Sequence, residues 1–316
     1  KESCIACGIA DTADKGRVYG AICDNLAIVY NLCSMNDMGK KIGFIGQGFI
    51  GKNYADDFEA RGYPVVRYSL EEPHINNKEK IAECDIVFIA VNANTTPSGF
   101  DDSNIRSGLG IVGEGKIAVI KSTLLPGMTK TLQKDFPVIT VLFSPEFLSE
   151  ATAAQDAAHP FSNIIGLSVD DERHRAAAAL VHEVLPSAPF MLTCDSDEAE
   201  IIKYAHNISG YAQIITFNLI YEMAHILGHD WTNIGKAIIA DPLVCARYAN
   251  PVHKTGRGAG GNCFIKDFAA FANAYEKLVG DKEGMDALRA FEAKNKKLLR
   301  ESKKDTHLLK GVYGEE

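Results

Sequence analysis

A chain of 316 residues with 46% hydrophobic content is long enough to bury the cores of two domains. Its 33 basic and 41 acidic residues give a net charge of −8, which argues against a nucleic-acid partner because such a surface needs clustered Lys and Arg. No apolar run reaches about 18 residues and the first residues lack the order of a signal peptide, so we expect a cytoplasmic protein without a membrane partner.

The first segment, residues 1–39, gives no clear structural signal, and we expect an N-terminal extension of unknown role. The chain has eight cysteines and no secretory signal, which indicates reduced thiols rather than a disulfide framework. Cys4, Cys7, Cys23 and Cys33 could supply four zinc ligands. The second pair lacks the two-residue gap of a common zinc site, so we predict no metal.

From residue 40 to residue 196, apolar runs alternate with helical stretches, which is typical of a parallel sheet covered by helices. The sequence therefore predicts an α/β domain with a doubly wound parallel sheet. One Ala-rich helix is expected over 171–185. Seven strands are expected, at 41–46, 64–69, 85–91, 116–122, 138–144, 162–168 and 188–194.

Three glycines, Gly46, Gly48 and Gly51, follow the first predicted strand in the spacing G-x-G-x-x-G. The first permits a tight turn, the second lets the backbone approach a pyrophosphate, and the third allows close helix–strand packing. The next helix offers free N–H groups and a positive dipole to the anion. The pattern predicts a Rossmann-type dinucleotide site. Further cofactor residues are expected beside it and near the ends of neighbouring strands: Phe49, Ile50, Ser69, Val91, Thr95, Ser122 and Thr123.

The end of the second strand distinguishes NAD from NADP, because a carboxylate there binds the ribose 2′-OH and repels a 2′-phosphate. Ser69 occupies this position, and Glu71 and Glu72 follow shortly after. The expected acid is therefore missing or displaced. We favour NAD as the cofactor and leave NADP open.

The second part of the chain, residues 197–316, is expected to be a helical dimerisation and catalytic domain, without strands after Asp195. A helix of about 30 residues, roughly 45 Å long, should begin with Ser196 or Asp197 as N-cap and form a spine. Its apolar residues lie on more than one side, so we expect a homodimer; a monomer that buries both sides itself is the alternative. The charged tail, 292–316, is expected to be a solvated helix or a frayed end.

A single cysteine, Cys263, follows the glycine pair 260–261 and precedes a segment with the pattern of a helix start. The missing side chains would let a substrate carbon approach the sulfur, and the helix dipole would favour the thiolate that attacks carbonyls. Asp267, one helical turn later, would raise the pKa of the thiol unless a cation balances it. Lys203 is the candidate cation.

Other polar residues could join this cysteine. Lys203 and Asn207 are four residues apart on the expected long helix, so an ammonium and an amide could converge on a developing oxyanion. Thr123 and Glu146 follow the ends of two predicted strands, where ligands bind in open α/β sheets, and Glu150 follows Glu146. Taken alone, the pair would be surface groups and the carboxylates would be loop acids.

Together these residues resemble the nucleotide-sugar 6-dehydrogenases, a family that includes UDP-glucose and GDP-mannose 6-dehydrogenases. The resemblance covers about residues 41–271 and departs from the family at Ala93, where a Pro-Thr-Pro run is usual. Most members continue into a third, C-terminal α/β domain, and we expect this chain to lack it. Six ordered motifs carry the resemblance: GQGFIG, TTPSGFDDSN, KSTLLPG, SPEFLSE, KYAHN and GRGAGGNCFIKD.

The resemblance implies a four-electron oxidation of a primary alcohol to a carboxylate, with two nicotinamide cofactors used in succession. It implies that Cys263 forms a thiohemiacetal and then a thioester, while Lys203 and Asn207 stabilise the oxyanion. Asp267 and Thr123 would orient the hydrolytic water, and Glu146 would be a general base. The implied substrate is a nucleotide sugar, a UDP-sugar in preference to a GDP-sugar. Its implied contacts are Phe147, Leu148, Ser149, Glu150, Lys203, Asn207, Tyr248 and Gly260.

Two other functions match parts of the pattern. A 3-hydroxyacid dehydrogenase of the 6-phosphogluconate type shares a dinucleotide domain, a helical second domain and a K-x-x-x-N pair. Its single hydride transfer has no use for Cys263. A non-catalytic relative that binds sugar nucleotides or dinucleotides is suggested by Ser69 and Ala93. Replacing the cysteine would separate these alternatives from the four-electron oxidation.

Overall fold

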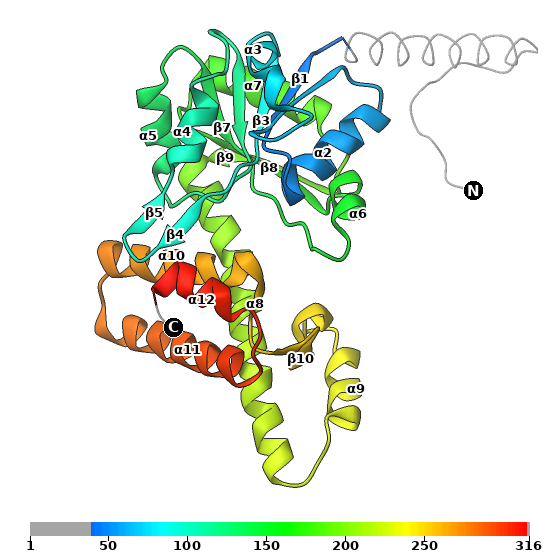
Figure 1. The fold of residues 1–316 in the computed structure, drawn as a ribbon, viewed down its shortest axis with the longest axis vertical. Helices are drawn as coiled ribbons and strands as arrows, with labels where there is room; N and C mark the ends of the chain where they lie inside the picture. Colours follow the sequence, from blue (N-terminus) through cyan, green and yellow to red (C-terminus); the bar gives the residue numbers. More distant parts are fainter. Residues whose placement is uncertain (1–38, 315–316) are drawn as a thin grey trace, which may run out of the picture.

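A computed structural model of the chain describes residues 39–314, which form a seven-stranded sheet and a helical part joined by one long helix (Figure 1). The four cysteines weighed as zinc ligands, and the N-terminal extension over 1–38, lie outside the described residues.

The sheet has the strand order β2-β1-β3-β6-β7-β8-β9, and each strand overlaps a predicted range. Neighbouring strands are parallel except β7 and β8, so the doubly wound fold is confirmed with one antiparallel step. The connection between these two strands, residues 144–161 with α6, returns to the sheet at the carboxyl end of β7, and β8 therefore runs back from there. The strand bounds are β1 (Ile42–Ile45), β2 (Val65–Tyr68), β3 (Ile86–Ile89), β6 (Ile117–Ile120), β7 (Thr140–Phe143), β8 (Ser162–Leu167) and β9 (Phe190–Asp195).

Both faces of the sheet are buried, which explains why its central strands are continuous apolar runs. Successive strand residues point to opposite faces, so Ile89 and Ile120 belong to one core while Phe44 and Phe88 stack in the other. Helices cover the first face: α3 (Lys78–Ile81), α4 (Ser103–Leu109), α5 (Met128–Asp135) and the start of the long helix. Helices also cover the second face: α2 (Phe49–Ala60), α6 (Ala153–Ala158) and α7 (Glu172–Val184).

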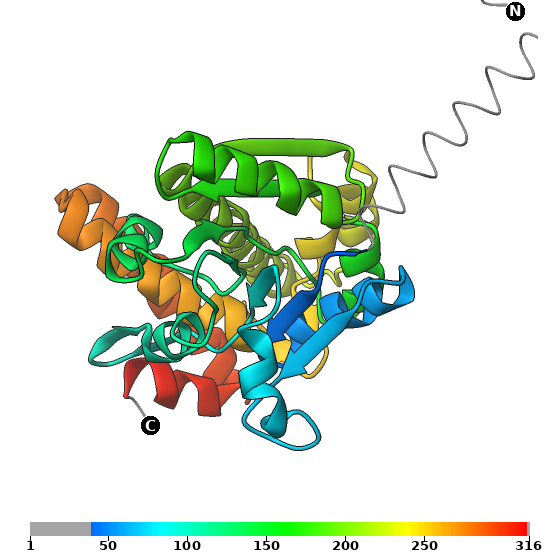
Figure 2. The same cartoon turned by 90° about the horizontal axis from the view of Figure 1, so that it is seen from above.

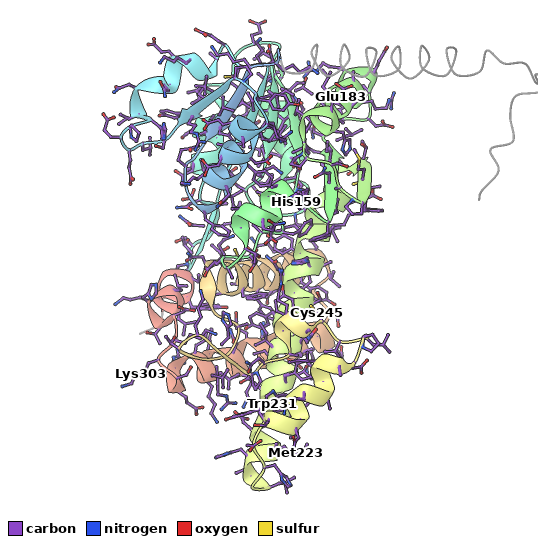
Figure 3. The ribbon with its side chains drawn as sticks, turned by 90° about the vertical axis from the view of Figure 1, so that its right-hand side faces the viewer. His159, Glu183, Met223, Trp231, Cys245 and Lys303 are labelled. Atoms are coloured by element: carbon purple, nitrogen blue, oxygen red, sulfur yellow. The ribbon has the colours of Figure 1, made fainter. Side chains whose placement is uncertain are left out.

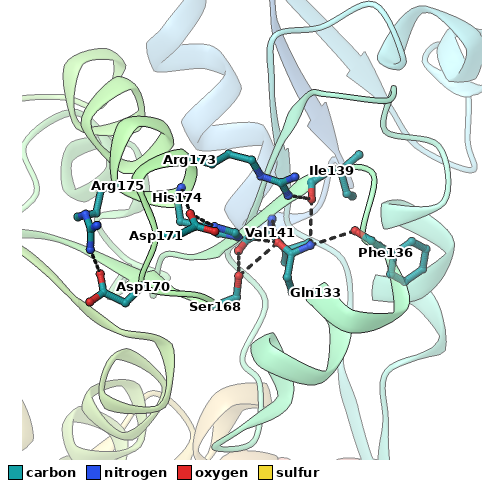
Figure 4. A network of polar contacts seen from close by, with 10 residues as sticks. All are labelled: Gln133, Phe136, Ile139, Val141, Ser168, Asp170, Asp171, Arg173, His174 and Arg175. Carbon is teal, nitrogen blue, oxygen red and sulfur yellow. Dashed lines mark hydrogen bonds and ion pairs between the residues drawn. The ribbon is translucent and has the colours of Figure 1, made fainter.

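A polar network joins α5 and α7 to the sheet (Figure 4). The side chain of Gln133 accepts the N–H of Val141 at 2.8 Å and donates to two backbone carbonyls before β7. The buried ring of His174 lies between Gln133 Oε1, at 2.8 Å, and Asp171 Oδ1, at 2.7 Å. These bonds satisfy buried polar groups and fix the two helices against the strands.

The long helix α8 (Ser196–Ile226) is the 31-residue spine that the sequence predicts. Its N-cap is Asp195, in a capping box with Glu198, so the predicted caps Ser196 and Asp197 are wrong by one or two positions. The helix leaves the sheet and runs through the helical part (Figure 1). Within residues 39–314 no helix combines the length and the apolar composition needed to cross a bilayer.

Two small hairpins complete the fold. The first, β4 (Asn94–Thr96) with β5 (Gly99–Asp101), lies beside α12 in both views and also contacts α10, so it is a second link between the two parts (Figures 1 and 2). The second is β10 (Val252–His253) with β11 (Gly256–Arg257), so the expectation of no strand after Asp195 is wrong. Neither hairpin was predicted, because strands of two or three residues leave no periodic signal. Single-turn helices η1 (Ile75–Asn77) and η2 (Ala246–Tyr248) lie in loops. The remaining helices are α9 (Thr232–Ala240), α10 (Gly261–Leu278), α11 (Lys282–Glu301) and α12 (Thr306–Tyr313).

The charged tail is packed, and the expectation of a solvated or frayed end is wrong for its described residues. Leu298, Leu299 and Leu309 are buried, and the last two pack with Ile265 of α10. The charged residues of α11 obscured an amphipathic pattern whose apolar side faces the protein. The tail therefore belongs to the body of the helical part.

Candidate active site

The thiol of Cys263 lies in the first turn of α10 and is exposed to solvent. The N-cap, Gly260, has no capping side chain. Among the residues described, none accepts the backbone N–H of Asn262 or of Cys263. The positive end of the helix is thus open beside the sulfur, and it can serve a developing negative charge.

The glycine pair before the cysteine differs from its expected role at one position. A Cβ at Gly260 would lie 2.2 Å from Asp305 Oδ2, so this glycine makes room for the C-terminal segment and not for a substrate. Gly261 has φ +80°, and a Cβ there would meet only Glu150 Oε1, at 3.8 Å. The positive φ and the open space at Gly261 remain consistent with an approach to the sulfur.

A buried ion pair joins the sheet to the spine. Glu146 follows β7, and Lys203 Nζ donates to its Oε1 at 2.9 Å and to its backbone oxygen at 2.6 Å. Burial opposes ionisation of Glu146, but the charge and hydrogen bond of Lys203 and the N–H of Leu148 lower its pKa. Burial lowers the pKa of Lys203, but Glu146, Asp267 and Cys263 outweigh it and raise the pKa. The ammonium therefore lies within electrostatic reach of the thiol.

A second buried pair lies beside the first. Asn207 Nδ2 donates to Asp267 Oδ2 at 2.6 Å, and Lys266 Nζ contacts the other carboxylate oxygen at 2.5 Å. Crowding by protein raises the pKa of the Cys263 thiol, Asp267 raises it further, and Lys203 offsets only part of this. Lys203 therefore does not offset the effects of burial and Asp267, contrary to expectation, and the sulfur is protonated at neutral pH.

Sequence reasoning missed Lys121, which directly follows β6 and is buried. Its ammonium donates to Ser144 Oγ at 3.2 Å and lies 4.3 Å from the ring centre of Tyr54. Burial lowers the pKa of Lys121 to about 8, against the attraction of Glu146. The sequence did contain one indication, a lysine directly after a wholly apolar strand. Lysine is rarely buried unless it has a polar or charged partner.

The loop predicted to contact substrate lies partly at a cavity of about 220 Å³, lined among others by Lys121, Phe147, Leu148 and Arg247. Two backbone donors of this loop are already used: the N–H of Leu148 bonds Glu146 Oε2, and the N–H of Ser149 bonds Asp156 Oδ2, both at 2.9 Å.

Two other predicted substrate residues also have neighbours. Glu150 forms an exposed pair with Lys254 at 2.5 Å. The ring of Tyr248 packs against Gly210, where a Cβ would lie 2.8 Å from it, and against Phe264. Tyr248 is thus fixed against α8, between the spine and the first turn of α10.

A larger cavity, of about 690 Å³, opens at the carboxyl ends of β1, β2 and β3. Gly46 has φ +90°, and a Cβ there would lie 2.2 Å from the Ala90 oxygen. A Cβ at Gly51 would lie 1.9 Å from the Gly46 oxygen, whereas one at Gly48 would meet nothing within 4 Å. This geometry supports a tight turn, close helix packing, and a backbone open to a phosphate, in the positions predicted for a dinucleotide.

Of the other predicted cofactor residues, only Ser69 and Val91 line this cavity. Ser69 lines it as a neutral side chain whose hydroxyl donates to the Glu71 backbone oxygen at 2.9 Å, and Glu71 and Val91 line it too. Ser122 Oγ donates to the oxygen of Val91 at 2.6 Å and accepts its N–H, so it joins the ends of β3 and β6. Those that do not line the cavity are Phe49, Ile50, Gly51, Thr95, Ser122 and Thr123.

The glycine turn, the doubly wound sheet and the helical part on a long spine define a two-domain dinucleotide-binding protein. Within that class the chain belongs to the UDP-glucose/GDP-mannose dehydrogenase family. Residues 72–185 match the family's NAD binding domain, and residues 197–297 match its central domain. The turn with Gly46, Gly48 and Gly51 precedes the matched residues, so its assignment depends on the geometry above.

Relatives and solved structures agree with this family. A UDP-glucose 6-dehydrogenase from Streptococcus pneumoniae is 27% identical over 223 residues, which covers 67% of this chain and 55% of that protein. A solved UDP-glucose dehydrogenase from the archaeon Pyrobaculum islandicum is 25% identical with a TM-score of 0.71, covering 87% of this chain and 72% of that chain. This chain spans about half the length of the curated relatives it matches.

A 3-hydroxyisobutyrate dehydrogenase from Mycobacterium tuberculosis also has this fold, at 16% identity and a TM-score of 0.60, covering 81% of this chain and 95% of that chain. This is a likeness of fold alone. The fold therefore does not separate the two classes of dehydrogenase, and the choice between them depends on the cysteine and its neighbours.

Proposed function

We propose that this chain catalyses the NAD-dependent oxidation of the C6 primary alcohol of a nucleotide sugar to a uronic acid. The observation that carries the proposal is the exposed thiol of Cys263 within electrostatic reach of the buried Lys203, Glu146 and Asp267. A single hydride transfer from an alcohol needs no nucleophile. An aldehyde, however, must gain a substituent before it can lose a second hydride, and a thiol supplies one.

The residues around the larger cavity fit a dinucleotide, since Gly46 and Gly48 offer an open backbone at a helix start. Glu71 lies two residues after Ser69, lines the same cavity, and is the acid we assign to the ribose hydroxyls. When bound, NAD accepts one hydride in each oxidation. Family membership favours NAD, and the neutral Ser69 is the reason to assay NADP beside it.

In the first oxidation, Glu146, ionised by its pair with Lys203, accepts the proton of the alcohol while hydride leaves the carbon. Cys263 then gives its proton to solvent, and its sulfur bonds the aldehyde carbon to form a thiohemiacetal. Loss of the second hydride leaves a thioester. Lys203 and the free amide proton of Asn207 stabilise the oxyanion in these steps.

Water completes the reaction. Asp267 and Thr123 orient a water molecule that attacks the thioester carbon. The carbon–sulfur bond then breaks, the carboxylate leaves, and the thiol is restored. Each turnover consumes one water, reduces two cofactors and releases no free aldehyde.

A grid of UDP- and GDP-sugars against NAD and NADP, followed by nicotinamide absorbance, tests the proposal. We expect turnover with a UDP-sugar and two cofactors reduced for each sugar consumed. Measurable binding without turnover of any sugar nucleotide would instead favour a non-catalytic relative. Reduction of one cofactor for each substrate molecule, with a 3-hydroxyacid as substrate, would favour the other dehydrogenase class.

The far end of the spine supports the proposal of a homodimer. Leu219, Met223 and Leu227 are spaced four residues apart on and just beyond α8, and all three are exposed (Figure 3 labels Met223). Ile239 on α9 and Leu243 after it are exposed as well. Such a run of apolar side chains is typical of an interface. Light scattering should give twice the chain mass, and a monomer at micromolar concentration would contradict the proposal.

A further inference from the structure

The segment before Cys263, residues 256–261 and named the glycine loop below, is held by side chains from the C-terminal part of the chain. Asn295 on α11 is buried; it accepts the N–H of Ala259 at 2.7 Å and donates to the oxygen of the same residue at 3.0 Å. Lys304 Nζ donates to the oxygen of Gly258 at 2.9 Å. These bonds fix the middle of the glycine loop on both sides of one peptide unit.

The end of the glycine loop is held as well. Asp305 Oδ2 accepts the N–H of Gly261, the first residue of α10, at 2.8 Å. This contact lies two residues before Cys263. Asp305 itself lies beyond the residues that match the family's central domain, which end at 297.

The glycines themselves show how closely these side chains approach. A Cβ at position 256 would lie 2.4 Å from Ser302 Oγ, and one at position 258 would lie 2.8 Å from Asn295 Oδ1. A Cβ at position 260 would lie 2.2 Å from Asp305 Oδ2. At distances this short, a side chain on the loop would displace the group that contacts it. Three of the four glycines in the loop are therefore needed so that the C-terminal segment can contact the backbone.

We propose that Asn295 and Asp305 are positioning residues for Cys263, because they fix the glycine loop and with it the first turn of α10. The fixed turn leaves the N–H groups of Asn262 and Cys263 open and keeps the sulfur within reach of Lys203. A loosened turn would lose both the helix dipole and the cation, and it would change the burial of the thiol, so the thiol would react more slowly and its pH profile would shift.

Asp305 offers a matched pair of substitutions because its backbone is left-handed, with φ 53°. Asp305→Asn keeps an acceptor and a residue that tolerates this conformation. Asp305→Gly also tolerates the conformation, but removes the acceptor. Lys303, two residues earlier, has φ 54° and an exposed side chain at the outer surface (Figure 3). Lys303→Gly therefore reproduces the backbone change without removing a contact to the glycine loop.

The experiment measures alkylation of each cysteine in the full chain by iodoacetamide as a function of pH, resolved by mass spectrometry. Cys245 is exposed and serves as the internal reference, while the buried Cys84 reports any unfolding. We expect Asp305→Gly to lower the Cys263 to Cys245 ratio roughly five-fold and to shift the pH midpoint of Cys263 alkylation. Asp305→Asn and Lys303→Gly should stay within about two-fold of the unaltered chain. Asn295→Leu should act in the direction of Asp305→Gly.

Two results would overturn the proposal: an unchanged ratio and pH profile in Asp305→Gly, or an equal loss in Asp305→Asn, which would assign the effect to charge. If Asn295→Leu fails to fold, as alkylation of Cys84 would reveal, the Asp305 pair still decides. The proposal depends on the proposed function only for the role of Cys263 as nucleophile. Alkylation requires no sugar nucleotide, so failure of the proposed oxidation would be seen separately.

Discussion

Removal of one partner of the buried Lys203–Glu146 pair tests the electrostatics of the site. The substitution Lys203→Met keeps the bulk of the side chain but leaves a carboxylate that is only 3% exposed. Breaking a buried ion pair in this way costs about 3–5 kcal/mol. Lys121 and the N–H of Leu148 still interact with Glu146, so we expect a loss near the lower limit, about 3 kcal/mol of unfolding free energy.

The double variant Lys203→Met with Glu146→Gln removes both charges and should recover most of this loss. We expect a remaining cost of about 1 kcal/mol, so adding Glu146→Gln to Lys203→Met should restore about 2 kcal/mol of unfolding free energy, measured by urea unfolding at pH 7. The pH dependence of stability also shows whether ionised Glu146 stabilises or destabilises the folded chain. In the unaltered chain the pKa of Glu146 is lowered, so its contribution is present above the ordinary carboxyl pKa and is lost as pH falls through the lowered value.

In Lys203→Met the pKa of Glu146 should instead rise, because burial is no longer opposed by the main cation. The stability difference from the unaltered chain should therefore shrink as pH falls from 7 toward about 5. A double variant as unstable as the single variant would refute the reasoning, since it would show that the unpaired carboxylate is not the source of the loss.

Two further predictions concern the turn after β1 and a buried carboxylate on α8. Gly51→Ala should cost about 2 kcal/mol of stability, because a Cβ would lie 1.9 Å from the Gly46 oxygen. Gly48→Ala should cost less than about 1 kcal/mol but weaken dinucleotide binding at least about ten-fold by calorimetry; equal binding would remove the pyrophosphate from this turn. Burial raises the pKa of Glu200 from 4.5 to about 7 despite hydrogen bonds from Gly127 and Thr129, so unfolding free energy should fall as pH rises from about 4.5 through 7. Glu200→Gln should reduce this decrease of unfolding free energy with pH. An equal decrease in the variant and the unaltered chain would contradict the prediction.

The central strands β1, β3, β6 and β7 could be predicted because they are largely buried and form mostly apolar runs. The direction of β8 could not, since it depends on where the connection over residues 144–161 returns to the sheet and not on the composition of the strand. The start of α8 was predicted within two residues, and the missed cap, Asp195, lies at the end of a strand where its capping role was hidden.

Spacing indicated which residues of the site could meet, but not how they pair. Asn207 and Lys203 do project from one side of α8, yet the amide bonds Asp267 and the ammonium bonds Glu146. Such partners are chosen by tertiary packing, which no local pattern encodes. Lys121 was missed for the same reason.

The positioning residues were missed because the sequence of their segment is rich in charged residues and shows no sign of its tertiary contacts. Asn295 and Asp305 are separated from the glycine loop by more than a helix in sequence, and they meet it only after α11 turns back along α10. The glycines were noticed as a motif, but their purpose depends on side chains that approach from this distant segment.

The most direct test of the account is the yield of carboxylate and of reduced cofactor for Cys263→Ala, with the nucleotide sugar that the unaltered chain oxidises. The account predicts two cofactors reduced for each sugar in the unaltered chain and no acid in the variant, because the aldehyde cannot form the thiohemiacetal. An unchanged yield of acid from Cys263→Ala would contradict it.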